Sequence, residues 1–203
     1  MVRLSLARGT WRLVAIPVVL TPVIAVVSRI GALGALVVAA GIAWFHRDPD
    51  RSPPETGVVA PADGTVSVLR NEGDRIRLGV FMNVDDVHVC RAPVDATVAS
   101  RTHAPGAHRP AFSKESDRNE RVDLTLDTPT DQWEVRLIAG VFARRIHPYA
   151  STGDRLRRGE RIGHISFGSR VDVLFPPTIN EEDIAVDPGD SVRAGETQIL
   201  SRA

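Results

Sequence analysis

Two patterns of apolar residues divide the chain into an N-terminal part and a larger remainder. The stretch Leu13 to Phe45 is almost wholly apolar and is interrupted at Ser28-Arg29. We expect two helices, Leu13–Val27 and Ile30–Phe45, forming an apolar hairpin with Arg29 near its tip. Each piece is somewhat shorter than the roughly 20 residues that cross a bilayer as one helix. The pattern leaves open whether this hairpin spans a membrane or lies within it.

The residues that flank this stretch are typical of a membrane anchor. Trp11 and Trp44 would lie at the same lipid–water interface, and arginines both precede and follow the stretch. Residues 1–47 are therefore predicted to anchor the protein to the cell membrane, with the rest of the chain on the cytoplasmic side. A cleaved signal peptide is the weaker alternative, because the stretch is too long and lacks a clear small-residue cleavage site. A single tilted helix also stays open.

The remainder of the chain has the pattern of a β domain. Residues 48–57 are rich in proline and charge and are predicted to be a linker. After them the apolar residues alternate with polar ones, and no stretch after residue 50 shows a convincing helical period. We expect residues 58–203 to form a mostly antiparallel β domain, with strands at Thr65–Leu69, Arg75–Val80, Val87–Val89, Val122–Leu126 and Trp133–Ile138.

A weak internal repeat refines this fold. Gly153–Ile162 echoes Gly189–Ile199, with glycines six apart and an Asp after the first of them, which suits tight hairpin turns. This spacing resembles the turns of barrel-sandwich folds such as biotinyl and lipoyl domains. Those domains carry their cofactor on a lysine at a hairpin tip, whereas the only lysine here, Lys114, lies in an irregular polar segment. The repeat thus predicts a barrel-sandwich-like fold without a carrier function.

Composition excludes several classes of function. The 203 residues carry 25 basic and 25 acidic side chains, so no basic field favours nucleic acid. Cys90 is the only cysteine, which excludes an internal disulfide and suggests a small buried side chain. The histidines are scattered, so no metal is expected.

The candidate chemistry lies at Gly168-Ser169, between two strand-like segments. Glycine has no Cβ, so the carbonyl of Gly168 can be approached closely. In a strained turn the hydroxyl of Ser169 could attack that carbonyl and break the chain. A Gly-Ser pair by itself is more often an ordinary turn between strands.

Five motifs favour a catalytic role for Gly168-Ser169 over an ordinary turn. They are Pro61–Gly64, Phe81–Pro93, Asn119–Arg121, Ile138–Ile146 and Gly163–Asp172. In order and spacing they resemble the phosphatidylserine decarboxylase proenzymes, and above all their short, archaeal-type branch. The resemblance runs from about Pro49 to about Pro177.

The resemblance implies a carboxy-lyase that matures by cutting itself between Gly168 and Ser169. The products would be a large β chain, residues 1–168, and a small α chain, residues 169–203, which stay together as a heterodimer; a higher oligomer is left open. Ser169 would become a pyruvoyl group that forms a Schiff base with the substrate amine, without pyridoxal phosphate or metal. The substrate would be a membrane phospholipid with a serine head group, either phosphatidylserine or archaetidylserine.

The resemblance also implies which residues assist the attack by Ser169. His88 matches the family's histidine and is the candidate base, while Asp63 matches the acidic residue expected to orient it. Longer members carry a second histidine where this chain has Arg91, and an arginine is a poor base. The role of Arg91 is left open.

The polar stretch from Ser100 to Arg121 is expected to be a long loop. It could cap the active site and bind the lipid phosphate through Arg109, Lys114 and Arg121, or it could be a solvated charged loop.

A different class of function stays in competition. A non-enzymatic, membrane-tethered adaptor domain of barrel-sandwich type would explain the hairpin and the repeated Gly-Asp turns. It would not explain Ser169 together with His88 and Asp63, and self-cleavage distinguishes the two.

Overall fold

The computed structural model of the protein describes residues 5–106, 119–140, 145–166 and 169–200. Contacts between residues divide the chain into two compact units, Met1–Asp50 and Arg51–Ala203. Each unit is described by itself.

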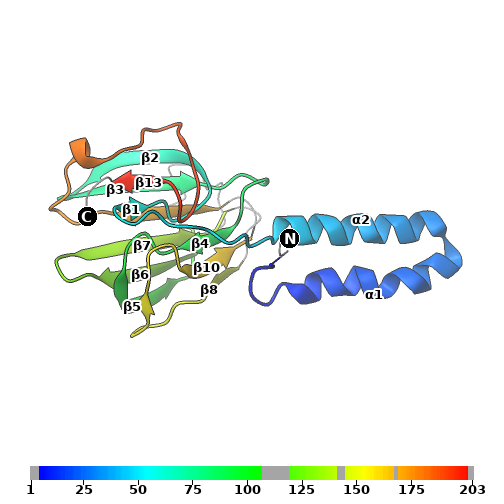
Figure 1. Ribbon diagram of the computed structural model, residues 1–203. Helices are drawn as coiled ribbons and strands as arrows, with labels where there is room; N and C mark the ends of the chain where they lie inside the picture. The colour runs from blue at the N-terminus through cyan, green and yellow to red at the C-terminus, as the bar shows by residue number, and fades with distance from the viewer. Residues whose placement is uncertain (1–4, 107–118, 141–144, 167–168, 201–203) are drawn as a thin grey trace. The chain divides into compact units, whose positions relative to one another are not determined.

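The first unit consists of two helices, α1 (Trp11–Val27) and α2 (Arg29–Phe45), which lie side by side and antiparallel (Figure 1). Ser28 separates them, and its hydroxyl accepts a hydrogen bond of 3.1 Å from the N–H of Gly31, which caps α2. The two predicted helices are thus present, with bounds close to those expected. Within the described part of the chain, neither of these helices nor any other is long and apolar enough to cross a membrane.

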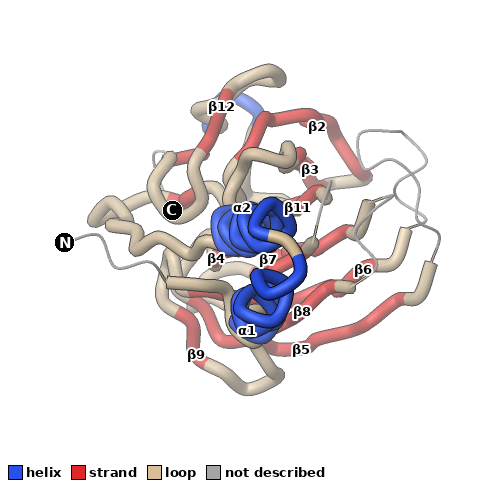
Figure 2. Tube along the Cα trace, turned by 90° about the vertical axis from the view of Figure 1, so that its right-hand side faces the viewer, coloured by secondary structure: helices blue, strands red, loops and turns tan. Residues whose placement is uncertain are grey.

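The second unit is built almost entirely of antiparallel strands. The largest sheet has eight strands in the order β12-β2-β3-β11-β7-β6-β5-β9, and it curls into a half-barrel (Figure 2). A three-stranded sheet, β4-β10-β8, and a two-stranded sheet, β1-β13, complete the unit. The strands are β1 (Val58–Val59), β2 (Gly64–Glu72), β3 (Arg75–Phe81), β4 (Val89–Arg91), β5 (Ala96–Ala104), β6 (Arg121–Asp127), β7 (Gln132–Ile138), β8 (Ile146–Pro148), β9 (Arg155–Leu156), β10 (Arg161–Ile165), β11 (Arg170–Leu174), β12 (Ser191–Val192) and β13 (Gln198–Leu200), with a short 3-10 helix, η2, at Glu181–Asp183. The expectation of a mostly β, antiparallel domain behind two helices is confirmed.

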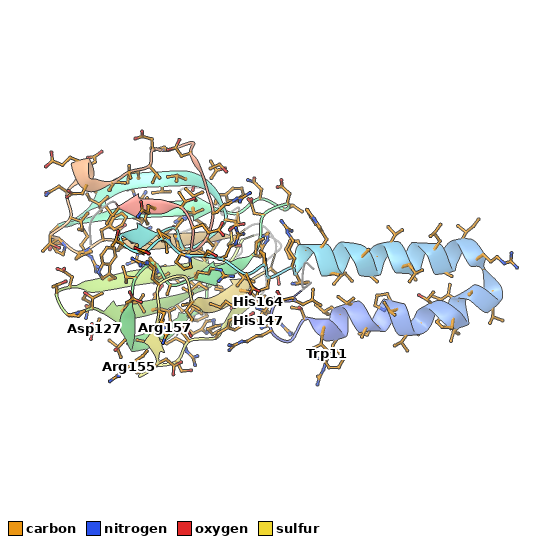
Figure 3. All side chains as sticks on the ribbon, in the orientation of Figure 1. Trp11, Asp127, His147, Arg155, Arg157 and His164 are labelled. Atoms are coloured by element: carbon orange, nitrogen blue, oxygen red, sulfur yellow. The ribbon has the colours of Figure 1, made fainter. Side chains whose placement is uncertain are left out.

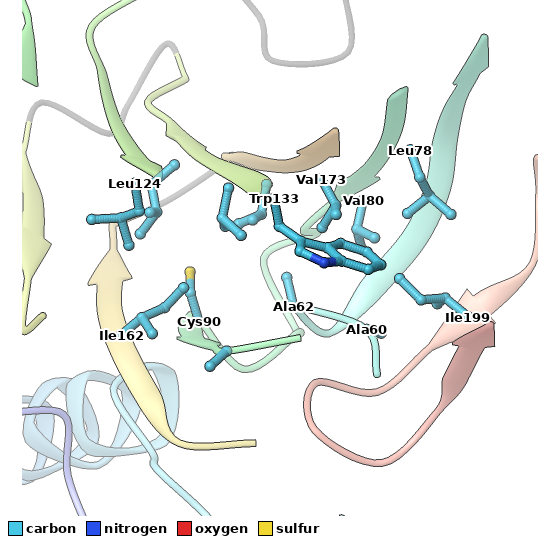
Figure 4. Packing of buried hydrophobic residues seen from close by; sticks show 14 of the residues in the cluster. Ala60, Ala62, Leu78, Val80, Cys90, Leu124, Trp133, Ile162, Val173 and Ile199 are labelled. Atoms are coloured by element: carbon cyan, nitrogen blue, oxygen red, sulfur yellow. The ribbon is translucent and has the colours of Figure 1, made fainter. Parts of the chain in front are cut away.

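Alternation of side chains gives the eight-stranded sheet an apolar inner face. Leu124 of β6, Trp133 of β7 and Val173 of β11 point into the core, together with Leu78 and Val80 of β3 (Figure 4). Because successive residues of a strand point to opposite faces, their neighbours form the outer face. That outer face is charged, and its most buried member, Asp172, accepts hydrogen bonds of 2.7 and 2.9 Å from Arg170.

The internal repeat is visible in the backbone. Gly153 and Gly189 have φ of 92° and 102° at the two matching turns, a conformation that side chains with a Cβ rarely adopt. The N–H of Gly153 bonds to the carbonyl of Val98 at 2.8 Å, and the N–H of Gly189 bonds to that of Val66 at 2.8 Å. The two halves of the repeat therefore hold equivalent positions, one against β5 and the other against β2.

One expectation about the loops is wrong. The long loop predicted from Ser100 does not begin there, because residues 96–104 form β5, which pairs with β6 from Thr97 to Ala104. Because its side chains are mostly polar, this segment lacks the apolar alternation from which a strand is predicted. The strand is stabilised by its backbone pairing with β6.

Candidate active site

Ser169 lies directly before β11, the strand between β3 and β7. Its carbonyl accepts a hydrogen bond of 2.9 Å from the N–H of Met82, and its side chain is fully buried. β11 pairs along its whole length with strands on both sides, so the position of Ser169 is fixed by the register of the sheet.

Strand register brings the sequence motifs into one row. Arg170 pairs with Phe81 on one side and with Ile138 on the other, Phe81 pairs with Thr65, and Ile138 pairs with Arg121. One step further toward this end of the sheet are Gly64, Met82, Ser169, Ala139 and Glu120, which we call the Ser169 row. The N–H of Ala139 bonds to the carbonyl of Glu120 at 2.9 Å, which confirms the register at that end. Each of the five motifs thus contributes one residue to this row, at one end of the half-barrel.

The Ser169 row faces the core. Val171 and Val173 of β11 are core residues, so alternation places Ser169 on the same inner face. Met82 and Ala139, its neighbours in the row, are also core residues. Among the described residues, Ser169 Oγ has no hydrogen-bond partner. A buried hydroxyl without a partner is costly for the fold, so a function is a reasonable explanation for its presence.

Gly64 allows the chain to pass close to this row. A Cβ at Gly64 would lie 2.0 Å from the carbonyl oxygen of Phe81, and its φ is 143°. Only glycine fits such a contact. The turn that carries Asp63 is thereby pressed against the end of β3, next to Met82.

His88 lies directly before β4 and is buried. Its Nδ1 is 3.0 Å from the carbonyl oxygen of Asp86. A carbonyl can only accept, so in the neutral ring Nδ1 carries the hydrogen and Nε2 is the basic nitrogen. The carbonyl of His88 accepts a hydrogen bond of 3.2 Å from Ile165, the last residue of β10 and four positions before Ser169. Alternation places His88 on the same side as Cys90, a core residue.

The carboxylate of Asp63 binds groups from distant parts of the chain. Oδ2 forms an ion pair of 2.7 Å with Arg51, and Oδ1 accepts a hydrogen bond of 2.8 Å from the N–H of Ala194. Burial raises the pKa of Asp63, against the opposing charge and hydrogen bonds of these two residues, and the charge of Asp86 adds to the increase. The carboxylate of Asp63 thus joins Arg51 and Ala194, whereas Nδ1 of His88 lies against the carbonyl of Asp86.

Arg91 and Cys90 have contacts typical of residues that stabilise a fold. Arg91 Nη1 donates a hydrogen bond of 2.8 Å to the carbonyl of Gly159, at a turn where φ is 76°. Alternation along β4 directs Arg91 away from the face that carries His88 and Cys90. Burial raises the pKa of the Cys90 thiol far above its usual range, as expected for a core residue.

Of the predicted phosphate-binding residues, the structure describes Arg121 alone. Arg121 donates a hydrogen bond of 3.0 Å to Asp123, and alternation directs both to the outer face of the sheet. Arg109 and Lys114 lie outside the described residues, as does Gly168. In the described part of the chain, no group of three or more His, Cys, Asp or Glu side chains could hold a metal ion.

Sequence reasoning missed two residues that shape this site. Glu120 is the end of the Ser169 row, and the side chain of Asn119, buried beside it, donates a hydrogen bond of 2.8 Å to the carbonyl of Ala139. Both belong to the motif Asn119–Arg121, which carried the resemblance without an assigned role. Their position depends on which strands pair, a fact that the motif alone does not contain.

Comparisons with known proteins show which family the chain belongs to. Residues 38–200 match the family model described as phosphatidylserine decarboxylase. A Halobacterium salinarum protein, named provisionally as an archaetidylserine decarboxylase proenzyme, is 56% identical over 97% of this chain and 100% of its own length. A phosphatidylserine decarboxylase proenzyme of Thermobifida fusca is 48% identical over 83% of this chain and 76% of its own. One from Streptomyces griseus subsp. griseus is 43% identical over 97% and 84%. The chain therefore belongs to the phosphatidylserine decarboxylase family, an enzyme family of carboxy-lyases that are made as proenzymes, as its motifs indicated.

Proposed function

We propose that this protein removes carbon dioxide from the head group of a serine phospholipid, using a pyruvoyl group that it makes from Ser169. The observation that carries the proposal is the buried Ser169 hydroxyl, which has no hydrogen-bond partner among the described residues and lies in one row with the family's motifs. Family membership supports the reaction class.

Maturation begins with attack by the Ser169 oxygen on the carbonyl carbon of Gly168. The peptide nitrogen leaves that carbon, so the amide becomes an ester. Loss of the α-proton of residue 169 then expels the ester oxygen as the new carboxylate of Gly168, and the chain is cut. Water adds to the dehydroalanine that remains, and ammonia departs to leave the pyruvoyl group.

His88 is the proposed base for the first step. Its Nδ1 hydrogen is directed to the carbonyl of Asp86, so Nε2 is the nitrogen that can take the Ser169 proton. The hydrogen bond between His88 and Ile165 brings the two segments together on the inner side of the sheet. Asp63 is the proposed positioning residue, since its bonds to Arg51 and Ala194 hold the turn that passes close to Met82.

The same residues serve the decarboxylation. Once formed, the pyruvoyl carbonyl supplies the electron sink that makes loss of carbon dioxide from a bound amino acid head group feasible. His88 then holds the proton that returns to the α-carbon of the head group. Residue 169 is buried, so this chemistry takes place away from bulk water.

The head group, and not the tails, defines the proposed substrate. The relatives are named for phosphatidylserine and for archaetidylserine, which share the phosphoserine head group and differ in their lipid tails. Only the amine and carboxylate of that head group take part in the chemistry. We therefore propose both lipids as substrates to be tested.

The N-terminal helices are the proposed membrane attachment. Val26, Val27 and Ile30 at the turn between them are 88%, 89% and 85% exposed, which is unfavourable for apolar side chains in water. At the opposite end of the pair, Trp11 and Trp44 are exposed beside arginines, as is typical of residues at a lipid–water interface. Figure 3 labels Trp11. This pattern supports a hairpin whose tip enters the lipid, with the catalytic unit on the cytoplasmic side.

The deciding experiment is intact mass spectrometry of the wild type beside Ser169→Ala. The wild type is expected as two chains divided after Gly168, with a small chain that begins with a pyruvoyl group and lacks a free amine. Ser169→Ala is expected to stay whole. A folded wild type of full, uncut mass would contradict the proposal and favour the alternative, a membrane-tethered adaptor domain without catalysis.

A further inference from the structure

A cavity of about 340 Å³ opens between the edge of the eight-stranded sheet and β8. It takes residues from β5, β6 and β8 and from the segment just before β8. The lining residues are Arg101, His103, Glu120, Val122, Arg145, Ile146, His147 and Pro148. We call it the Arg101–Arg145 cavity.

This cavity borders the Glu120 end of the Ser169 row. Glu120, one of its lining residues, belongs to the row, and β6 is separated from β11 only by β7. Two strand spacings correspond to about 10 Å. Arg101 and His103 pair with Leu124 and Val122, so they lie on the inner face of the sheet, as Ser169 does.

The lining carries an excess of positive charge. Arg101 and Arg145 are both exposed, and the one carboxylate, Glu120, lies 3.0 Å from His103. Arg101 is oriented by a hydrogen bond of 2.9 Å from Nη1 to the carbonyl of Ala150. In the described part of the chain, Arg145 forms no hydrogen bond or ion pair, so no carboxylate there neutralises its charge.

The pKa of His147 depends on burial and on the charge of Arg145 in this cavity. Its ring stacks on that of His164, with centroids 4.4 Å apart (Figure 3), and His164 Nδ1 lies 2.7 Å from the hydroxyl of Tyr149. Burial lowers the pKa of His147, and the positive charge of Arg145 lowers it further. A bound anion would oppose the effect of Arg145 and raise this pKa.

We propose that the Arg101–Arg145 cavity binds the phosphodiester of the lipid head group while the amine of that head group reaches residue 169. The inference rests on the proposed function, because the amine must meet the pyruvoyl group. In a serine phospholipid the phosphate is only a few bonds from the amine, so it must lie within reach of the Ser169 row. Guanidinium groups suit phosphate oxygens, because they donate two parallel hydrogen bonds.

The first test is kinetic and uses the matured full-length enzyme with vesicles containing phosphatidylserine or archaetidylserine. Replacing both arginines, Arg101→Gln with Arg145→Gln, is expected to raise KM at least tenfold and to lower kcat much less. The matched control is Arg155→Gln, an exposed arginine that lines a different cavity, which is expected to keep the wild-type KM. A fully cleaved double variant with an unchanged KM would overturn the proposal.

The second test needs no activity and uses the uncut Ser169→Ala protein. The pKa of His147 is followed by NMR, with His147→Gln to assign the signal, during addition of glycerophosphoserine, inorganic phosphate or free serine. Glycerophosphoserine is expected to raise the pKa of His147, and Arg145→Gln to remove most of that response. The charged or titratable groups around His147, which must be considered in the fit, are Arg101, His103, Glu120, Arg145, Tyr149 and His164.

The outcomes separate this inference from the proposed function. An equal response to inorganic phosphate would assign the cavity to free phosphate, and no response to glycerophosphoserine would exclude a head-group site; either result overturns the proposal. A wild type that is never cut contradicts the proposed function, whereas the NMR titration still decides whether the cavity binds the phosphodiester.

Discussion

The N–H of Ala194 donates a hydrogen bond of 2.8 Å to Oδ1 of Asp63, and these two residues lie on opposite sides of the proposed cut. Arg51 adds an ion pair of 2.9 Å to Glu196, again between the future large and small chains. β11, which follows Ser169 directly, is hydrogen-bonded to β3 and β7 of the large chain. A cut at residue 168 therefore leaves the small chain held inside the sheet of the large one.

We predict that the two chains stay together after maturation. Size-exclusion chromatography of the cut protein is expected to give one peak with the chains in equal amounts, and only denaturant should separate them. The physical reason is that β11 could not leave without exposing core residues such as Val171 and Val173. Loss of the small chain from the folded large chain in native buffer would contradict the prediction.

The second prediction concerns His88 and Asp63. His88→Ala is expected to slow self-cleavage by about 10²–10⁴-fold, the usual contribution of a general base. Asp63→Ala is expected to slow it as well, because the bonds to Arg51 and Ala194 that hold its turn are lost. The fraction cut is followed over time by intact mass.

Two variants test the interpretation of this result. Asp127→Asn, a change at an exposed carboxylate, is the control and should be cut at the wild-type rate. Arg51→Gln removes the ion pair but keeps the Asp63 carboxylate. It therefore shows how much of the slower cleavage in Asp63→Ala comes from losing the contact that positions the turn of Asp63. Normal cleavage in both His88→Ala and Asp63→Ala would exclude their assigned roles.

The third prediction concerns the close approach at Gly64. Gly64→Ala places a Cβ 2.0 Å from the Phe81 carbonyl oxygen, so β2 and β3 must separate where the Ser169 row lies. We expect a lower Tm and slower cleavage. Gly73→Ala is the matched control, since Gly73 also has a positive φ, of 66°, but a Cβ there would meet nothing within 4 Å. Its cost should be only about 1–2 kcal/mol, the cost of a left-handed backbone. Equal stability and cleavage in the two variants would show that the contact does not matter.

Some of this fold could be predicted from the sequence for a clear physical reason. Most of β6 and β7 alternates between buried and more exposed side chains, so the pattern of apolar residues revealed these strands. β5 carries Ser100, Thr102 and His103, and its pairing with β6 depends on backbone hydrogen bonds that composition does not reveal.

The candidate site, like the fold, could be predicted from the sequence only in part. Ser169, His88 and Asp63 could be selected because they belong to motifs of characteristic composition and spacing. The Ser169 row depends on the registers of four neighbouring strand pairs, and these registers are set by contacts between residues far apart in the sequence. The ion pair from Arg51 to Asp63 could not be predicted either, because Arg51 lies in what the sequence suggests is only a linker.

The fourth prediction tests the membrane attachment. Val27→Asp together with Ile30→Asp puts two charges at the exposed turn between α1 and α2, and entry of a charge into lipid is costly. The wild type is expected to float with vesicles in a density gradient, and the double variant to remain in the lower fraction. Val84→Asp, a change at an exposed valine of the second unit, should float like the wild type. Equal flotation of all three would exclude the helix turn as the attachment.

The last prediction concerns the charged outer face of the sheet, where Glu72 contacts Arg77 at 2.6 Å and Arg136 at 3.3 Å. Burial alone would raise the pKa of Glu72, but the hydrogen bonds and charges of these two arginines outweigh it and hold the pKa below its usual value. A carboxyl whose pKa is lower in the folded protein stabilises the fold above its unfolded pKa, near 4.5, and loses this effect as the pH falls through the folded value. Glu72→Gln should therefore destabilise the protein at pH 7, by about 0.5–1 kcal/mol because the side chain is partly exposed and screened.

The pH dependence distinguishes this from a simple packing defect. Urea unfolding of the uncut Ser169→Ala protein, with and without Glu72→Gln, is expected to show the difference at pH 7 and a shrinking difference as the pH is lowered below 4.5. Glu182→Gln, a change in the exposed helix η2, should leave stability unchanged at each pH. A difference for Glu72→Gln that is constant with pH would mean that the arginines do not act on its charge. In that case the outer face would be stabilised by bonds that do not involve Glu72, such as those of Arg77 and Arg170 to Asp172 and that of Arg136 to Glu134.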